Sequence, residues 1–189
     1  FQIIGDKCTV FDELSITYLG TANNMAFVYD PKKGMYSFSN NKLVKIDGDD
    51  LIVNKMITGL LGNENEVIVA TQNYGLFKLI ENKISPWKTD GDSFLIKNHI
   101  TSASISLNGQ LAFGTDFAGR FHLDRNTDLL NNKVSSIFFD ENQNLWIGVD
   151  NGINYVEINS PFTRVFPDGN LEGAGFATKI FKGNIYFGT

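Results

Sequence analysis

Short stretches in which apolar and polar residues alternate dominate this chain, whereas apolar residues at helical spacing are few. Residues 67–71 and 145–149 are representative, because both are short, rich in β-branched or aromatic side chains and bounded by turn residues. Turn residues precede such stretches at 63–66, 108–109, 140–144 and 182–184. Asn-Gly between alternating apolar runs is the strongest local signal for a hairpin. The pattern therefore predicts an all-β chain assembled from antiparallel hairpins.

A short phrase, an apolar residue followed by a small residue and a β-branched one, recurs at 69–71, 113–115, 147–149 and 187–189. Residues 27–30 are a divergent first copy of the same phrase. Its copies end at residues 30, 71, 115, 149 and 189. A glycine and then an aromatic residue follow the first four copies, as the pairs Gly34 and Tyr36, Gly75 and Phe77, Gly119 and Phe121, and Gly152 and Tyr155. The glycine suits a turn position with positive φ. A period of roughly 40 residues marks propellers, solenoids or arrays, because one such unit cannot bury its apolar face alone.

One unit can be divided into four strands, which in the fourth copy cover residues 134–139, 145–149, 153–158 and 162–166. The first and second copies end in similar strands at 42–46 and 83–87, and the third copy lacks an obvious fourth strand. Four antiparallel strands in about 40 residues are typical of a propeller blade. We therefore predict one partial β-propeller of about four and a half blades of four antiparallel strands each. The predicted blades cover residues 10–47, 48–90, 96–124, 130–167 and, incompletely, 171–189.

The fifth copy of the phrase ends at Thr189, and the chain begins at Phe1 without an initiator Met or a signal peptide. We therefore expect this sequence to be an internal piece of a longer protein whose propeller continues.

Small hydroxyl residues lie thirteen positions before the end of each of the first four phrases, at Thr17, Thr58, Ser102 and Ser136. All four fall on the predicted first strand, which is innermost in a propeller. One interpretation is that only small side chains fit there. The other is a polar ring that lines a channel and binds a small ligand. Tyr74 and Phe117, in the turns after the second and third phrases, are further candidates, since loops on a rigid scaffold often carry function.

The composition excludes several other classes of protein. A net charge of −5 argues against nucleic-acid binding by this piece, since such binding requires a basic surface. A hydrophobic content of 42% suffices for a packed core. Cys8 is the only cysteine, so neither an internal disulfide nor a cysteine-based zinc cluster can form. No apolar run approaches about 18 residues, so we expect no membrane contact by this piece.

No catalytic, metal or cofactor site is predicted. His99 and His122 lack zinc-ligand spacing, and a G-x-S-x-G elbow is absent. Residues 47–50 carry three carboxylates but no EF-hand loop, so an acidic turn is expected there. Gly114 and Gly148 are not followed by a helix and therefore do not form phosphate cradles. Among the aromatic residues, we expect Trp146 to lie in the core between blades and Trp87 on an outer strand.

Residues 131–140 and 144–153 together resemble the two-component-regulator propeller repeat, which runs roughly as V-x-x-I-x-x-D-x-x-G-x-L-W-I-G-T-x-x-G-L. The sequence departs from that pattern at Val149, where the family prefers Thr, and at Gln143 or Asn144, where it prefers Gly. The other copies keep mainly the end of the phrase and the glycine–aromatic pair. The resemblance is thus weak over most of the chain and specific in one copy.

The resemblance implies an extracytoplasmic, ligand-sensing propeller of a membrane-anchored bacterial regulator, as found in Bacteroides-like organisms. Related proteins continue into a triple-tyrosine β-sandwich, a membrane helix and a histidine kinase or DNA-binding output. Residues 159–162 resemble the segment that precedes the triple-tyrosine module. The resemblance further implies periplasmic signal transduction, a glycan or other small ligand, and self-association through propeller edges or in the parent receptor. Two alternatives stay open: a propeller enzyme acting on glycans, and a non-catalytic dimerisation scaffold. The ligand, the output domain, the blade number and the oligomeric state do not follow from these residues.

Overall fold

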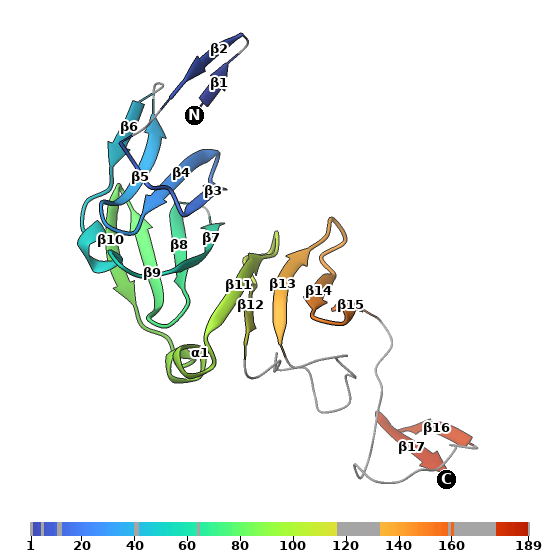
Figure 1. The fold of residues 1–189 in the computed structure, drawn as a ribbon. Coiled ribbons are helices and arrows are strands. Elements are labelled where there is room, and N and C mark those ends of the chain that lie inside the picture. The colour runs from blue at the N-terminus through green and yellow to red at the C-terminus, as the bar shows by residue number, and fades with distance from the viewer. Residues whose placement is uncertain are drawn as a thin grey trace. The chain divides into compact units, whose positions relative to one another are not determined.

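The computed structural model describes residues 2–4, 6–10, 13–39, 42–63, 65–116, 133–158, 160 and 177–188 (Figure 1). The chain divides into two units, Phe1–Asn159 and Ser160–Thr189, and each is described by itself. Almost all of the described regular structure is antiparallel β-strand, so the predicted all-β class is confirmed. No helix in these ranges is long and apolar enough to cross a membrane.

Two four-stranded sheets follow one another in the first unit, and in each the spatial order of the strands is their order in the sequence. The strands of the first sheet are β3 (Tyr18–Ala22), β4 (Met25–Asp30), β5 (Gly34–Ser39) and β6 (Lys42–Lys45). Those of the second sheet are β7 (Ile57–Asn63), β8 (Glu66–Thr71), β9 (Gly75–Ile80) and β10 (Lys83–Trp87). The recurring phrase is therefore the second strand of each sheet, followed by the glycine that opens the third.

The next two repeats are shorter within the described residues. The third sheet has two strands, β11 (Ile100–Ile105) and β12 (Leu111–Thr115). The fourth has three, β13 (Val134–Phe139), β14 (Leu145–Val149) and β15 (Gly152–Val156). The strand predicted at 162–166 lies outside the described residues.

The first strands of the four sheets lie side by side, in the order β3, β7, β11, β13 (Figure 1). The sheets pack face to face, and alternate residues of a central strand enter different cores. Val67 and Val69 belong to the core shared with the first sheet, whereas Ala70 belongs to the core on the opposite face. The sequence of β8 is thus an almost unbroken apolar run, because both faces of the strand are buried.

Two short helices were not predicted from the sequence. The 3-10 helix η1 (Asp49–Leu51) overlaps the acidic segment 47–50, where only a turn was expected, and helix α1 (Asp92–Asn98) precedes β11. Leu95 of α1 is buried against Ala70, Leu76 and Ile100. A helix of this length with one buried side chain leaves no periodic signal in the sequence.

One further hairpin was not predicted: in the first unit, β1 (Gln2–Ile4) pairs with β2 (Lys7–Thr9). The hairpin of β16 (Ala177–Phe181) with β17 (Asn184–Gly188) falls in the segment predicted as an incomplete fifth blade, 171–189, and is the described part of the second unit. Its turn, Lys182-Gly183, has positive φ at both residues, as two-residue hairpins favour.

Candidate functional site

The predicted site residues share one edge of the sheets, which we call the phrase rim: the ends of the second strands, the turns that follow them and the starts of the first strands. The registers place Ile57 opposite Thr71, Ile100 opposite Thr115, and Val134 opposite Val149. First strands therefore begin where the recurring phrases end, so the hydroxyl positions and the turn aromatics come from the same rim.

Thr17 and Thr58 lie at this rim with different surroundings. Thr17 directly precedes β3, its side chain is exposed, and its backbone N–H donates to Tyr29 O at 3.0 Å. Thr58 is half-buried in β7, and its Oγ1 donates to Ala70 O across the sheet at 3.4 Å.

The first strands of sheets two to four each contain a β-bulge at the rim. The register shifts between Ile57 and Gly59, between Ile100 and Ser102, and between Val134 and Ser136. The extra residues are thus Thr58, Thr101 and Ser135. Counting along the sequence made Thr58 equivalent to Ser102 and Ser136. In the structure Ser102 and Ser136 come one residue after the bulge, so their equivalent in the second sheet is Gly59. Neighbouring hydroxyl residues, Thr101-Ser102 and Ser135-Ser136, hide this one-residue offset in the sequence.

The hydroxyls of Ser102 and Ser136 are turned onto glycines of the paired second strand. A Cβ built on Gly114 would lie 2.5 Å from Ser102 Oγ, and one on Gly148 would lie 2.5 Å from Ser136 Oγ. This approach explains why the third and fourth phrases carry glycine there. Ser102 Oγ is buried and has no hydrogen-bond partner, whereas the Ser136 side chain remains exposed.

The bulge hydroxyls bond to neighbouring strands and turns. Thr101 Oγ1 donates to Val134 O at 2.6 Å and so joins the third sheet to the fourth. Ser135 Oγ lies 3.4 Å from Asp150 Oδ1, and Lys133 Nζ lies 3.9 Å from the other oxygen of that carboxylate.

Tyr74 projects from the turn between β8 and β9 and is 56% exposed. Lys55 Nζ lies 4.9 Å from the centre of its ring, a cation–π distance. The ring therefore offers an accessible aromatic surface beside a positive charge. Phe117 lies outside the described residues, so its role stays a prediction.

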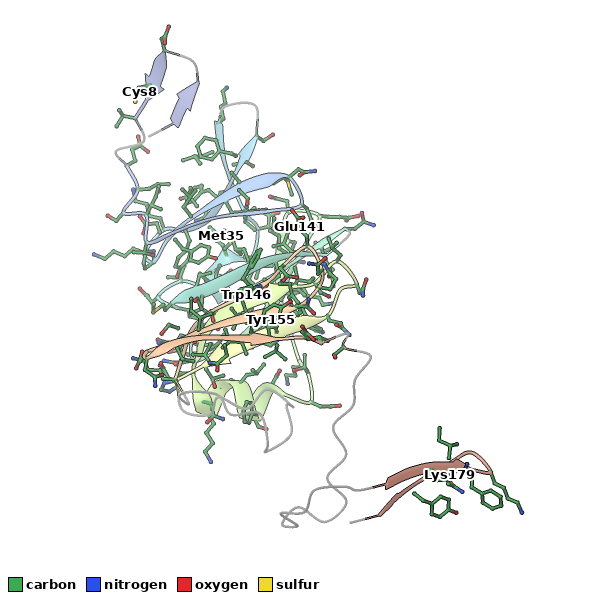
Figure 2. All side chains as sticks on the ribbon, turned by 90° about the vertical axis from the view of Figure 1, so that its right-hand side faces the viewer. Cys8, Met35, Glu141, Trp146, Tyr155 and Lys179 are labelled. Atoms are coloured by element: carbon green, nitrogen blue, oxygen red, sulfur yellow. The ribbon has the colours of Figure 1, made fainter. Side chains whose placement is uncertain are left out.

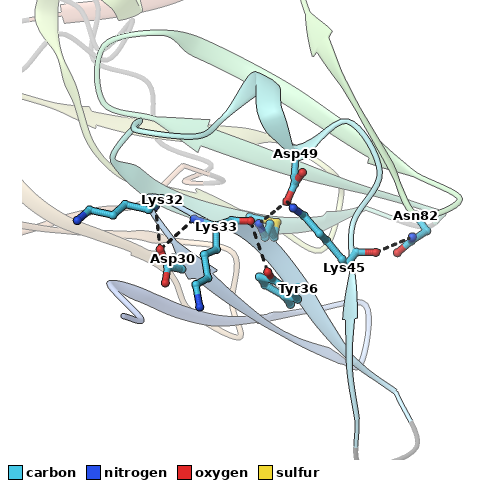
Figure 3. A network of polar contacts seen from close by, with 8 residues as sticks. Asp30, Lys32, Lys33, Tyr36, Lys45, Asp49 and Asn82 are labelled. Atoms are coloured by element: carbon cyan, nitrogen blue, oxygen red, sulfur yellow. Dashed lines mark hydrogen bonds and ion pairs between the residues drawn. The ribbon is translucent and has the colours of Figure 1, made fainter. Parts of the chain in front are cut away.

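Asp30 anchors the rim of the first sheet from a buried position, with 2% of its surface exposed. Its carboxylate accepts hydrogen bonds from the backbone N–H groups of Ser15 at 2.7 Å, Lys32 at 2.8 Å and Lys33 at 3.1 Å. The bonds from Lys32 and Lys33 can be followed in Figure 3. Burial alone would raise the pKa of Asp30, but these N–H groups and the Lys33 charge outweigh it and lower the pKa below its ordinary value of 3.8.

A second buried carboxylate holds the first sheet to the segment that follows it. Asp49 Oδ2 accepts the Met35 N–H at 3.1 Å and lies 3.6 Å from Lys45 Nζ (Figure 3). Gly34 has a φ of +96°, and a Cβ there would meet Asp49 Oδ2 at 1.8 Å. The acidic turn predicted at 47–50 thus supplies a carboxylate that folds into the protein.

In the fourth repeat, Asp140 organises the turn between β13 and β14. Its Oδ1 accepts the N–H groups of Asn142 and Asn144, both at 2.9 Å, and its Oδ2 accepts Trp146 Nε1–H at 3.0 Å. The Trp146 hydrogen bond contributes most to a lowered pKa of Asp140. The Trp146 and Tyr155 rings are tilted against each other with centroids 4.7 Å apart (Figure 2).

Trp146 itself is more exposed than predicted. The matching positions in the first three sheets, Phe27, Ile68 and Ala112, are 1%, 1% and 0% exposed, whereas Trp146 is 43% exposed. In the described part of the chain no following sheet covers the fourth, which accounts for the difference. Trp87, at the end of β10, is half-buried with Lys78 Nζ 4.4 Å from its ring centre.

No group of three or more His, Cys, Asp or Glu side chains that could hold a metal ion occurs among the described residues. Cys8 is exposed and free. His122 lies outside the described ranges.

Consecutive antiparallel sheets with adjacent first strands define a repeat protein of the propeller type. Residues 128–151 match the sequence profile of the family described as two component regulator propeller. The predicted resemblance to that family is thus confirmed, on the segment that holds the Asp140–Trp146 contact.

Solved structures support the same fold. A crystal structure named as the extracellular domain of the one component system BT4673 from B. thetaiotaomicron is 25% identical, with a TM-score of 0.55. It covers 77% of this chain, which spans 22% of the solved chain. A second structure of the BT4673 extracellular domain, named there as a hybrid two component system, is 24% identical with the same TM-score and coverage. No curated protein matches the chain.

Proposed function

We propose that this chain is part of an extracytoplasmic ligand-sensing propeller in a bacterial signal-transduction regulator, either a sensor histidine kinase or a transcriptional regulator. The observation that carries the proposal is the family repeat at 128–151, within a chain whose fold resembles the BT4673 extracellular domain. The parent protein is anchored in a membrane, and its output domain lies outside this piece.

The proposed ligand site is the phrase rim around Tyr74. Its exposed ring, the Lys55 ammonium and the hydroxyls of Thr17, Thr58 and Ser136 suit a hydroxyl-rich ligand such as a glycan. The role proposed for Ser102 is to pack within the rim rather than to contact the ligand, because its hydroxyl is buried against Gly114. The role proposed for these groups is recognition of a ligand.

In this proposal, the ligand signals by shifting the population of receptor molecules from one arrangement to another. The ligand changes the output only if it binds one arrangement of the receptor more tightly than another. The net charge of −5 favours neutral or cationic ligands over nucleic acids.

Isothermal titration of the 189-residue protein with defined glycan fragments tests the proposal. We expect saturable heat with at least one fragment, and Tyr74→Ala to raise its Kd about two- to twelvefold, since an aromatic contact contributes roughly 0.5–1.5 kcal/mol. Tyr186→Ala is the matched control: Tyr186 is 55% exposed but belongs to the second unit, and its removal should leave Kd unchanged.

The outcomes separate the proposed function from its alternatives. Absence of heat with every fragment, together with a tight dimer, would make this piece a scaffold. Turnover of a fragment would make it an enzyme. Equal effects of the two Tyr variants would remove the phrase rim as the site while leaving sensing intact.

A further inference from the structure

The N-terminal hairpin has the same register as the outer hairpins of the two complete sheets. In β1–β2, Ile4 pairs with Lys7 and Ile3 with Cys8, across a two-residue turn. In β9–β10, Ile80 pairs with Lys83 and Leu79 with Ile84, and β5–β6 has the corresponding pair Ser39 and Lys42. In each of these hairpins, therefore, the second strand begins with a lysine after a two-residue turn.

This alignment extends to the residue before the hairpin. With Ile3 matched to Leu79, Phe1 occupies the sequence position of Phe77 and Tyr36. These two are the aromatic residues of the glycine–aromatic pair that opens each third strand. The sequence and the register agree that residues 1–9 correspond to the third and fourth strands of a repeat.

In both complete sheets the third strand lies between the second strand and the fourth. Strand β5 pairs with β4, and β9 pairs with β8, whereas β6 and β10 lie at the edge. Pro86 in β10 fits an edge, because its missing N–H falls on the side without a partner strand. Among the described residues, β1 pairs only with β2, so its second edge is open.

We propose that β1 and β2 are the outer half of a propeller blade, and that the open edge of β1 binds the second strand of an inner hairpin of the same repeat type within the same polypeptide. The complete sheets supply the geometry, since each third strand follows its second strand through a three-residue turn. Main-chain hydrogen bonds give such strand addition its affinity, and register gives its specificity.

The register identifies the backbone group that makes this contact. The pair beside a two-residue turn exchanges hydrogen bonds, and the next pair does not. Leu79 is in such a next pair with Ile84, and on its other side it pairs with Val67 of β8. Ile3, in the equivalent pair with Cys8, therefore directs its N–H to the open edge of β1.

An N-terminal extension tests the proposal on the whole chain. A copy of residues 57–76, placed directly before Phe1, supplies a first and a second strand and restores the Gly-Leu-Phe sequence of residues 75–77. We expect amide hydrogen exchange at Ile3 to slow about tenfold or more relative to the unextended protein. The control extension carries the same residues in scrambled order and should leave the exchange at Ile3 unchanged.

Two proline variants of the extended protein form a matched pair. Ile3→Pro removes the N–H at the proposed contact, whereas Cys8→Pro removes one at the outer edge, where β10 itself carries Pro86. We expect Ile3→Pro to abolish the slowed exchange of the amide that faces it in the extension, that of the copied Val67, and Cys8→Pro to retain it.

Three results would overturn the proposal. These are equal exchange with the copied and scrambled extensions, retained slow exchange in Ile3→Pro, and slow exchange at Ile3 that appears in the unextended protein only at high concentration. The last result would identify a second copy of the chain as the partner. None of these measurements involves a ligand, so they are independent of the proposed sensing role.

Discussion

Close contacts, as well as turns, decide where glycine occurs in the recurring phrase. Gly114 and Gly148 lie within second strands, and each faces a serine hydroxyl of the first strand. At Gly114 a side chain of the next sheet also approaches, because Val134 Cγ1 and Cβ would lie 2.6 and 3.1 Å from an added Cβ. At Gly148 only Ser136 Oγ is that close, and an exposed hydroxyl can rotate away.

Alanine at these two glycines should therefore have unequal costs. Gly114→Ala should lower the free energy of unfolding by about 1–3 kcal/mol, since Val134 must move, and Gly148→Ala by less than about 1 kcal/mol. Urea denaturation with unchanged m-values measures both. Equal costs would show that Val134 yields as easily as the Ser136 hydroxyl.

The buried Asp30 carboxylate makes stability depend on pH. Its pKa is lower in the folded state than its ordinary value of 3.8, so ionised Asp30 stabilises the fold. That contribution is complete above the ordinary pKa and is lost as the pH falls through the folded-state value. The urea midpoint should therefore fall as the pH is lowered below about 3.8, and Asp30→Asn should lower the midpoint at pH 7 but reduce that further fall. An identical drop in both proteins would assign the acid sensitivity to other carboxylates.

Among the elements, α1 links the second sheet to the third through one side chain. Leu95 is buried with Ala70, Leu76 and Ile100, whereas the next residue, Ile96, is 40% exposed. The packing of the helix, rather than its own propensity, accounts for its position.

The two neighbouring residues of α1 give a matched test. Leu95→Ala should cost about 2–4 kcal/mol because it leaves a cavity in the core, and Ile96→Ala less than about 1 kcal/mol. Thermal or urea unfolding measures the difference. Similar costs would mean that the exposed face of α1 is packed against another part of the protein in solution.

The sequence predicted the strands better than the features that depend on neighbouring sheets. Alternation and glycine turns are local, so β4, β8 and β14 could be located from the phrase alone. The bulges are not local: Thr58 and Thr101 are equivalent only after strand pairing is known. The burial of Asp49 likewise depends on a contact with Met35 that no spacing rule contains.

For the candidate site, the same distinction holds. The sequence could predict that hydroxyls and turn aromatics share a rim, because antiparallel hairpins bring those positions together. It could not predict that Ser102 is turned onto Gly114, since this depends on the rotamer and on the packing of the next sheet.

At the scale of the first unit, each sheet packs mainly against its sequence neighbours, and separate apolar clusters join successive sheets. In such an array, stability is approximately a sum of nearest-neighbour terms, so damage at one interface should unfold one end first. The two tryptophans report on different sheets, since Trp87 ends β10 in the second and Trp146 lies in β14 in the fourth.

Equivalent core residues can test this local behaviour. Ile147 and Val69 occupy the same place in the phrase and are both fully buried, but in different clusters. With Trp87→Phe or Trp146→Phe isolating one signal, Ile147→Ala should lower the urea midpoint of Trp146 fluorescence more than that of Trp87, because it removes about 2–4 kcal/mol locally. Val69→Ala should have the opposite preference with a smaller effect. Equal shifts of both signals in each variant would show that the four sheets unfold as one cooperative unit, and the additive description would then fail for this chain.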